Sequence, residues 1–146
     1  MRTITSTIEL DATPEEVWAV LTDSSAYPDW NPFITELDGP LQVGSRLTVR
    51  IAPPGGRPMT FTPTVTDVEP ERRLAWLGRL LVPGLFDGAH CFVLEPLPGS
   101  RTRLVQTETF RGALVWFSGR LLQRTEAGFT AMNNALLRRV AERSPT

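Results

Sequence analysis

The fold of this chain is decided by two stretches, ATPEEVWAVLTD at residues 12–23 and YPDWNPF at residues 27–33. In the first stretch, Thr13 has the position of a helix cap, Pro14 follows it directly, and Glu16 comes three residues after the cap, as in a capping box. In the second stretch, two prolines restrict any helix to a short turn. We therefore predict two short helices near the start of the chain, which cover a sheet formed by the flanking sequence.

The segments on both sides of these helices alternate between apolar and polar residues, which is the period of a half-buried strand. Before the helices, Ile4, Ile8 and Leu10 share one face of the first predicted strand. After the helices, glycine and proline turns separate further predicted strands, and Pro63 within one of them indicates a sheet edge or a bulge. These further strands cover residues 47–51, 59–68, 74–77, 86–97 and 102–110.

The last third of the sequence changes to the period of an amphipathic helix, over residues 116–143. Thr125 and Gly128 lie on its apolar side, where small residues leave room against a sheet. We predict an α+β fold in which a strongly curved antiparallel sheet of about six to seven strands wraps around this C-terminal helix. The length of 146 residues is that of one domain, residues 1–146.

Composition and charge exclude several classes of function. The net charge of −1 gives no electrostatic basis for binding nucleic acid or an anionic membrane surface. The chain has one cysteine and one histidine, so we expect no metal site and no cofactor. No apolar run approaches the length of a membrane span and no secretory signal is visible, so we expect a cytoplasmic protein. We expect it to be a monomer or homodimer.

Several motifs resemble those of the START/SRPBCC superfamily, in particular its bacterial polyketide cyclase/dehydrase-like members. Besides the two opening stretches, they are RLAWLG at residues 73–78, HCFVLEP at 90–96, GSRTRL at 99–104 and ETFRG at 108–112. The resemblance covers nearly the whole chain and implies a ligand-binding domain with the helix-grip fold. The superfamily contains lipid carriers, hormone receptors, aromatase/cyclases, co-chaperones and dioxygenase subunits, so the resemblance does not imply one function.

Alternation also predicts which side chains face the concave side of the sheet. One strand places His90 there, and the next strand places Gln106 and Glu108 there. A few polar groups in an apolar pocket are what a small-molecule site needs to orient its ligand. A histidine and a carboxyl group within reach of each other can also act as acid and base.

His90 and Glu108 each have an alternative, structural role. His90 could hydrogen-bond to Asp87 at the start of its strand. Glu108 could pair with Arg120 or Arg124 on the last helix, since buried carboxylates are normally paired. The sequence leaves these roles open beside the functional ones.

Three functions follow from these observations. The first is binding of a hydrophobic or aromatic small molecule, lipid-like or polyketide-like, between the sheet and the last helix. The second, implied by the resemblance to aromatase/cyclases, is an enzyme that uses His90 and Glu108 as acid–base groups. The third is a co-chaperone-like module that binds protein through the outer face of the sheet. The expected ligand-binding residues are Trp30, Phe33, Trp76, His90, Phe92, Gln106, Glu108, Phe110, Phe117, Leu121, Thr125, Gly128 and Met132.

Overall fold

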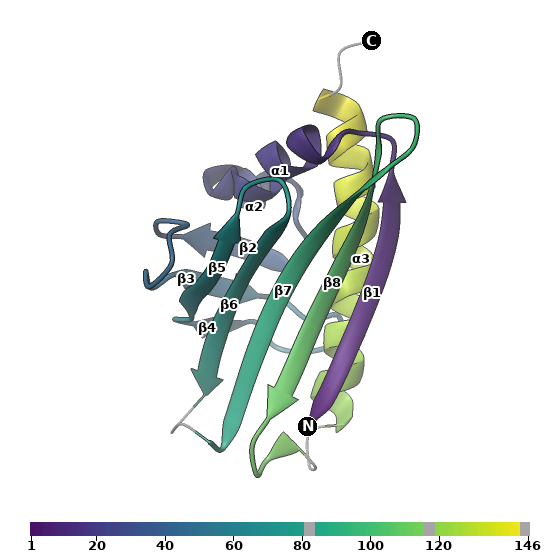
Figure 1. Ribbon diagram of the computed structural model, residues 1–146. Coiled ribbons are helices and arrows are strands. Elements are labelled where there is room, and N and C mark those ends of the chain that lie inside the picture. The colour runs from purple at the N-terminus through teal and green to yellow at the C-terminus, as the bar shows by residue number, and fades with distance from the viewer. Residues whose placement is uncertain (81–83, 116–118, 144–146) are drawn as a thin grey trace.

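The computed structural model describes residues 1–80, 84–115 and 119–143 (Figure 1). Residues 116–118, which the sequence places at the start of the last helix, lie outside the described residues. The elements in chain order are β1 (Arg2–Leu10), α1 (Pro14–Thr22), the 3-10 turn η1 (Ser24–Ala26), α2 (Tyr27–Trp30), β2 (Ile34–Asp38), β3 (Thr48–Ile51), β4 (Met59–Phe61), β5 (Thr64–Glu69), β6 (Arg73–Leu80), β7 (Phe86–Leu97), β8 (Arg101–Arg111) and α3 (Gly119–Arg143).

The strands form a five-stranded sheet in the order β1-β8-β7-β6-β5 and a three-stranded sheet in the order β2-β3-β4. A bridge between Arg46 and Thr64 connects the two sheets. Pro63 lies between β4 and β5, so the predicted strand 59–68 is two strands that belong to different sheets. The predicted fold class is confirmed, with eight strands among the described residues where six to seven were predicted.

Helix α3 packs across the concave face of the five-stranded sheet and runs alongside β1 (Figure 1). Apolar and polar residues repeat along α3 with the helical period, because one side of the helix packs on the sheet and the other side faces solvent. The exposed side includes Gln123, Glu126 and Thr130. The side chains buried against the sheet are Leu122, Thr125, Phe129, Met132, Asn133, Ala135, Leu136 and Val140.

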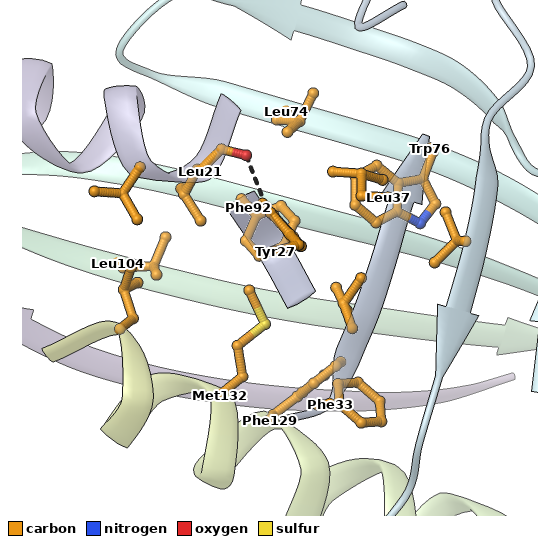
Figure 2. Packing of buried hydrophobic residues seen from close by; sticks show 14 of the residues in the cluster. Leu21, Tyr27, Phe33, Leu37, Leu74, Trp76, Phe92, Leu104, Phe129 and Met132 are labelled. Atoms are coloured by element: carbon orange, nitrogen blue, oxygen red, sulfur yellow. Dashed lines mark hydrogen bonds between the residues drawn. The ribbon is translucent and has the colours of Figure 1, made fainter. Parts of the chain in front are cut away.

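The two short helices after β1 are fixed by local hydrogen bonds. The predicted capping box is present, since Thr13 Oγ1 accepts from the N–H of Glu16 at 3.2 Å and the N–H of Thr13 donates to the Glu16 carboxylate at 3.4 Å. Tyr27 is fully buried, and its hydroxyl donates to the Leu21 carbonyl at 2.7 Å (Figure 2). This bond ties the start of α2 to the end of α1 above the core.

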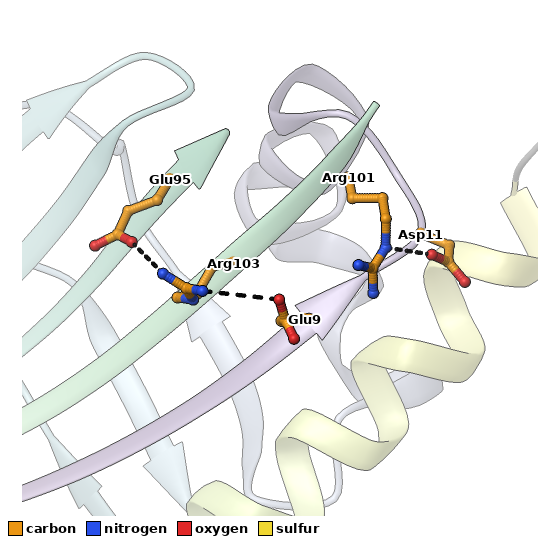
Figure 3. Close-up of polar contacts among 5 residues, drawn as sticks. All are labelled: Glu9, Asp11, Glu95, Arg101 and Arg103. Carbon is orange, nitrogen blue, oxygen red and sulfur yellow. Dashed lines mark hydrogen bonds and ion pairs between the residues drawn. The ribbon is translucent and has the colours of Figure 1, made fainter. Parts of the chain in front are cut away.

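The outer face of the five-stranded sheet carries charged side chains that pair across strands (Figure 3). Arg103 on β8 lies between Glu95 on β7 and Glu9 on β1, with nitrogen–oxygen distances of 3.4 and 3.8 Å. Arg101 pairs with Asp11 at 2.7 Å. Exposed pairs of this kind add about 0.2–1 kcal/mol each at most. They mark the solvent face of the sheet and leave the other face for apolar side chains.

Candidate functional site

The register of β6, β7 and β8 brings the predicted concave-face residues into rows. Trp76 on β6 lies opposite His90 on β7, and His90 lies opposite Glu108 on β8. In the next row, Phe92 lies opposite Gln106. Cross-strand partners point to the same face of an antiparallel sheet, so the assignment of these residues to one face is confirmed.

A cavity of about 60 Å³ lies between this face, the strands β2–β4 and helix α3. A second cavity of about 50 Å³ adjoins it. The two cavities share the lining residues Phe61, Trp76, Phe86, Glu108 and Phe110. The lining is apolar and aromatic with few polar side chains, which is the usual make-up of a small-molecule site.

His90 and Glu108 meet inside the first cavity. His90 Nδ1 lies 3.6 Å from Glu108 Oε2, and the two side chains are only 5% and 18% exposed. The imidazole stacks on the Trp76 ring, with centroids 5.1 Å apart and an interplanar angle of 13°. Phe92 and Phe129 contact it from other directions, with centroid distances of 4.4 and 5.2 Å. Three aromatic rings therefore hold the imidazole in one orientation, with Nδ1 beside the carboxyl group.

Burial keeps both groups uncharged near neutral pH. It lowers the pKa of His90 to about 3, and the neighbouring Gln106 amide opposes this lowering by a smaller amount. It raises the pKa of Glu108 to about 8. Ionised groups lose their hydration in an apolar cavity, so a neutral acid beside a neutral imidazole is the stable form of the pair. The pair thus presents an O–H donor and a ring nitrogen instead of two charges.

Behind His90, buried amides connect the sheet to α3. The Nε2 of Gln106 donates to Asn133 Oδ1 at 2.6 Å, and the Nδ2 of Asn133 donates to Ser6 Oγ on β1 at 2.8 Å. Gln106 is fully buried, and its Oε1 has no hydrogen-bond partner among the described residues. Sequence reasoning did not identify Asn133, because an asparagine in an amphipathic helix is usually part of the solvent face.

Some of the residues predicted to bind ligand line the first cavity. Their role in ligand binding stays a prediction, because a residue that lines a cavity need not contact a ligand. They are Phe33, Trp76, His90, Glu108, Phe110, Leu121 and Thr125.

The other predicted ligand-binding residues lie elsewhere. Phe92, Gln106 and Met132 are fully buried and are not part of the described lining of the cavity. Phe92 and Met132 lie in the apolar core (Figure 2). Trp30 is half-buried at the end of α2, and it too is outside that lining. Phe117 lies outside the described residues. Gly128 lies against the ring of Phe33, which is part of the cavity lining.

Sequence reasoning missed the wall of the cavity that faces the five-stranded sheet. The alternation in residues 47–51 and 59–68 predicts strands but gives no sign of which distant element they face, and β2 was not predicted as a strand. Phe129 follows Thr125 by one helical turn, so its spacing on the apolar side of the helix could have identified it. The lining residues that were not predicted are Ile34, Val49, Ile51, Met59, Phe61, Phe86 and Phe129.

The alternative structural role of His90 is wrong. Asp87 is three residues from His90 on β7, which pairs with β8 without a register shift, so the two side chains point to opposite faces. The Asp87 carboxylate accepts from the N–H of Gly84 at 3.3 and 3.4 Å. His90 therefore meets Glu108 on the concave face, and Asp87 lies on the outer face.

The alternative structural role of Glu108 is also wrong. Within the part of the chain that the structure describes, the basic side chain within 4 Å of the Glu108 carboxyl group is that of His90. The Arg124 side chain lies against Gly55 and Gly56 in the hairpin between β3 and β4. Arg120 is exposed, so neither arginine provides a counter-charge in the cavity lining.

Gly128 allows α3 to approach Phe33 closely. A methyl group at Gly128 would overlap the Phe33 ring, which lies directly over this position. The same ring lines the cavity and packs edge-on against Phe129, with centroids 5.7 Å apart at 82°. The glycine on the buried side of the helix therefore determines where one wall of the cavity stands.

Gly128→Ala should destabilise the protein, although alanine is the better helix former. The added methyl group must displace Phe33, and overpacking of this kind costs about 1–3 kcal/mol. Gly119→Ala is the matched control in the same helix, because a methyl group there meets nothing within 4 Å. It should leave stability unchanged or raise it by up to about 1 kcal/mol. Urea unfolding measures both variants, and equal effects would contradict this explanation.

Across residues 1–80, 84–115 and 119–143, no group of three or more His, Cys, Asp or Glu side chains could hold a metal ion. No described helix has both the length and the apolar character to cross a membrane. Cys91 is a free thiol that is partly buried.

Comparison with known proteins agrees with this architecture. A family model described as polyketide cyclase / dehydrase and lipid transport matches residues 1–144. No functionally curated protein matches the sequence.

Solved structures share the fold at low sequence identity. A START superfamily protein from Mycobacterium smegmatis is 19% identical with a TM-score of 0.78, over 97% of this chain and 99% of that chain. An aromatase/cyclase from a Streptomyces species is 22% identical with a TM-score of 0.76, over 97% and 94%. A protein from Mesorhizobium loti is 22% identical with a TM-score of 0.77, over 99% and 100%. At these identities the likeness shows the fold alone.

Proposed function

The chain belongs to the family of polyketide cyclase / dehydrase and lipid transport proteins, and we propose that it binds a hydrophobic or aromatic small molecule between its sheet and α3. The observation that carries this proposal is the apolar cavity with His90 and Glu108 in its wall. Such pockets bind by burying apolar surface and use a few polar groups to orient the ligand. In this proposal, residues 1–146 act as one ligand-binding domain.

A pair of tryptophan substitutions in α3 tests this function. Leu121 lines the cavity, whereas Leu137 is 44% exposed on the same helix. The wild type should bind toluene saturably in isothermal titration calorimetry. Leu121→Trp should weaken this binding about tenfold or more, a loss of about 1.4 kcal/mol, because the indole fills the cavity. Leu137→Trp should leave the affinity unchanged.

Two results would contradict the binding function. One is a wild type that binds neither toluene nor its hydroxyl analogue benzyl alcohol saturably. The other is an equal loss of affinity in Leu121→Trp and Leu137→Trp, which would place the binding outside the cavity. Native mass spectrometry of the purified protein complements this test, because it detects and weighs a ligand that co-purifies.

The contact between His90 and Glu108 supports a second candidate, an enzyme of the polyketide cyclase or aromatase type. Two groups 3.6 Å apart can both reach one reacting oxygen, with Glu108 giving a proton and His90 accepting one. The cavity volumes of about 60 and 50 Å³ favour binding of a small molecule over folding of a long poly-β-keto chain. Turnover that persists in both His90→Ala and Glu108→Ala would contradict the enzymatic candidate.

The protein-binding candidate has less support. A protein-binding surface gathers large apolar side chains into a continuous exposed patch. In the described part of the chain, the large apolar side chains that are exposed come from four separate segments. They are Met1, Val43, Leu114 and Leu137.

A further inference from the structure

We infer that the cavity selects an uncharged ligand of single-ring size, whose hydroxyl or carbonyl oxygen hydrogen-bonds to Glu108 and His90. The inference rests on the proposed function and adds the chemical class of the ligand. It is carried by the polar atoms of the cavity wall, by the charges around them and by the space available.

The polar end of the cavity has unused hydrogen-bonding capacity. Glu108 Oε2 is buried and has no hydrogen-bond partner among the described residues. Its 3.6 Å distance to His90 Nδ1 is longer than a hydrogen bond. An unsatisfied buried polar group costs about 1–3 kcal/mol. A ligand hydroxyl that approaches both atoms from the cavity can accept from Glu108 and donate to His90, and a ligand carbonyl can accept from Glu108.

The buried amides behind His90 prepare its ring for this contact. Gln106 donates through Nε2 to Asn133, which leaves Gln106 Oε1 as an acceptor. Gln106 and His90 are diagonal neighbours on adjacent strands, within reach for long side chains. Gln106 Oε1 and His90 Nε2 are both buried without a hydrogen bond of regular geometry, and Gln106 is the side chain that raises the pKa of His90 against the effect of burial, so an N–H on His90 Nε2 is favoured. His90 Nδ1, beside Glu108, then carries the lone pair that accepts from the ligand.

The charges around the cavity disfavour an ionic ligand. Among the described lining residues of the two cavities, His90 and Glu108 are the ionisable ones. Burial holds the pKa of Glu108 near 8 and that of His90 near 3, so neither provides a counter-charge near neutral pH. A carboxylate or ammonium group would lose its hydration there without a partner. The charged side chains on the elements that pack around Glu108 do not line either cavity; among them are Arg2 on β1, Arg79 on β6, Asp87 on β7, Arg111 on β8, and Arg120 and Arg124 on α3.

The available volume sets the size of the ligand. The adjoining cavities measure about 60 and 50 Å³. Together they are no larger than the engineered apolar cavity of about 150 Å³ that binds benzene, so a single ring with a short substituent is the upper limit of ligand size. Trp76 and Phe110 line both cavities and provide aromatic surface for such a ring.

Four probes of nearly equal size test this inference: toluene, benzyl alcohol, benzoate and benzylammonium. They share one ring and differ in an apolar, a hydroxyl, an anionic or a cationic substituent. Isothermal titration calorimetry is carried out at a pH about two units below the Glu108 pKa of about 8. We expect benzyl alcohol to bind the wild type about tenfold or more tightly than either ion.

Two variants at Glu108 locate the contact. Glu108→Leu should reduce the affinity for benzyl alcohol, relative to toluene, by about tenfold, because the O–H donor is lost. Glu108→Gln keeps a donor and should hold the benzyl alcohol affinity within about threefold of wild type. Glu36→Gln, at an exposed position on β2, is the matched control for the removal of a carboxyl group. Toluene binding by each variant shows that its cavity is intact.

The possible outcomes separate the inference from the function on which it rests. Benzoate or benzylammonium that binds the wild type as tightly as benzyl alcohol overturns the inference. So does a Glu108→Leu variant that retains the wild-type ratio of benzyl alcohol to toluene affinity. A wild type that binds neither toluene nor benzyl alcohol contradicts the proposed function itself.

Discussion

Phe129→Ala should destabilise the protein by about 3–5 kcal/mol, the range for removing a fully buried aromatic ring. Phe129 is 0% exposed and packs edge-on against both Phe33 and His90, with centroid distances of 5.7 and 5.2 Å. It stands between the cavity and the core, next to Met132 (Figure 2). The loss is large because the ring contributes to three contacts at once: the helix with the sheet, the cavity wall and the face of His90.

The same substitution should change the size of ligand that the protein accepts. Removal of the ring leaves a void that is continuous with the cavity, because Phe129 is part of the cavity lining. Naphthalene, whose two fused rings exceed the single ring that the wild-type cavities accommodate, should then bind to the variant more tightly than to the wild type. Urea unfolding measures the first effect, and calorimetric titration with naphthalene measures the second.

Phe61→Ala is the matched control for this prediction. Phe61 also lines the cavity, but it is only partly buried on β4, at the edge of the three-stranded sheet. Its loss should cost clearly less than the loss of Phe129, because less apolar surface is buried there. Equal costs for the two variants would show that Phe129 is not the side chain that supports the core beside the cavity.

Local patterns were sufficient to predict most of the fold. The capping box at Thr13 and Glu16 depends on residues three positions apart, so the sequence alone contains it. The strand period of two placed Trp76, His90 and Glu108 on one face, and the register confirms this because β6, β7 and β8 pair without a shift where these residues meet. The same period excludes a contact between His90 and Asp87, a consequence that the sequence reasoning overlooked.

The rest of the site depends on contacts between distant segments, which no local pattern contains. The partner of Gly128 is Phe33, which precedes it by most of the chain, and only the docking of α3 brings them together. The wall formed by β2–β4 is separate from the five-stranded sheet because the predicted strand 59–68 is interrupted at Pro63. The part before Pro63 is β4 in the three-stranded sheet, and the part after it is β5 in the five-stranded sheet. The helical period placed the small residue Gly128 on the buried side of α3, but it could not identify Phe33 as the side chain that packs there.

The free energy of unfolding should be highest between about pH 4.5 and 6.5 and should fall on both sides. Burial raises the pKa of Glu108 from 4.5 to about 8. Between these values the native protein keeps a proton that the unfolded chain releases, so stability falls as pH rises. Burial lowers the pKa of His90 from 6.5 to about 3, so this residue makes stability fall as pH decreases through that range. From pH 4.5 to 6.5 the two trends oppose each other and cancel.

Glu108→Gln should remove the loss of stability on the alkaline side. Above pH 6.5 the wild type should lose about 1.4 kcal/mol per pH unit, or about 2 kcal/mol by pH 8, and the variant should lose none of this. Urea unfolding at a series of pH values measures both slopes, and Glu36→Gln, at an exposed position, should keep the wild-type slope. A Glu108→Gln variant with the wild-type slope would mean that Glu108 is already ionised in the native state. The cavity would then contain a carboxylate, and a cationic ligand would fit it better than an uncharged one.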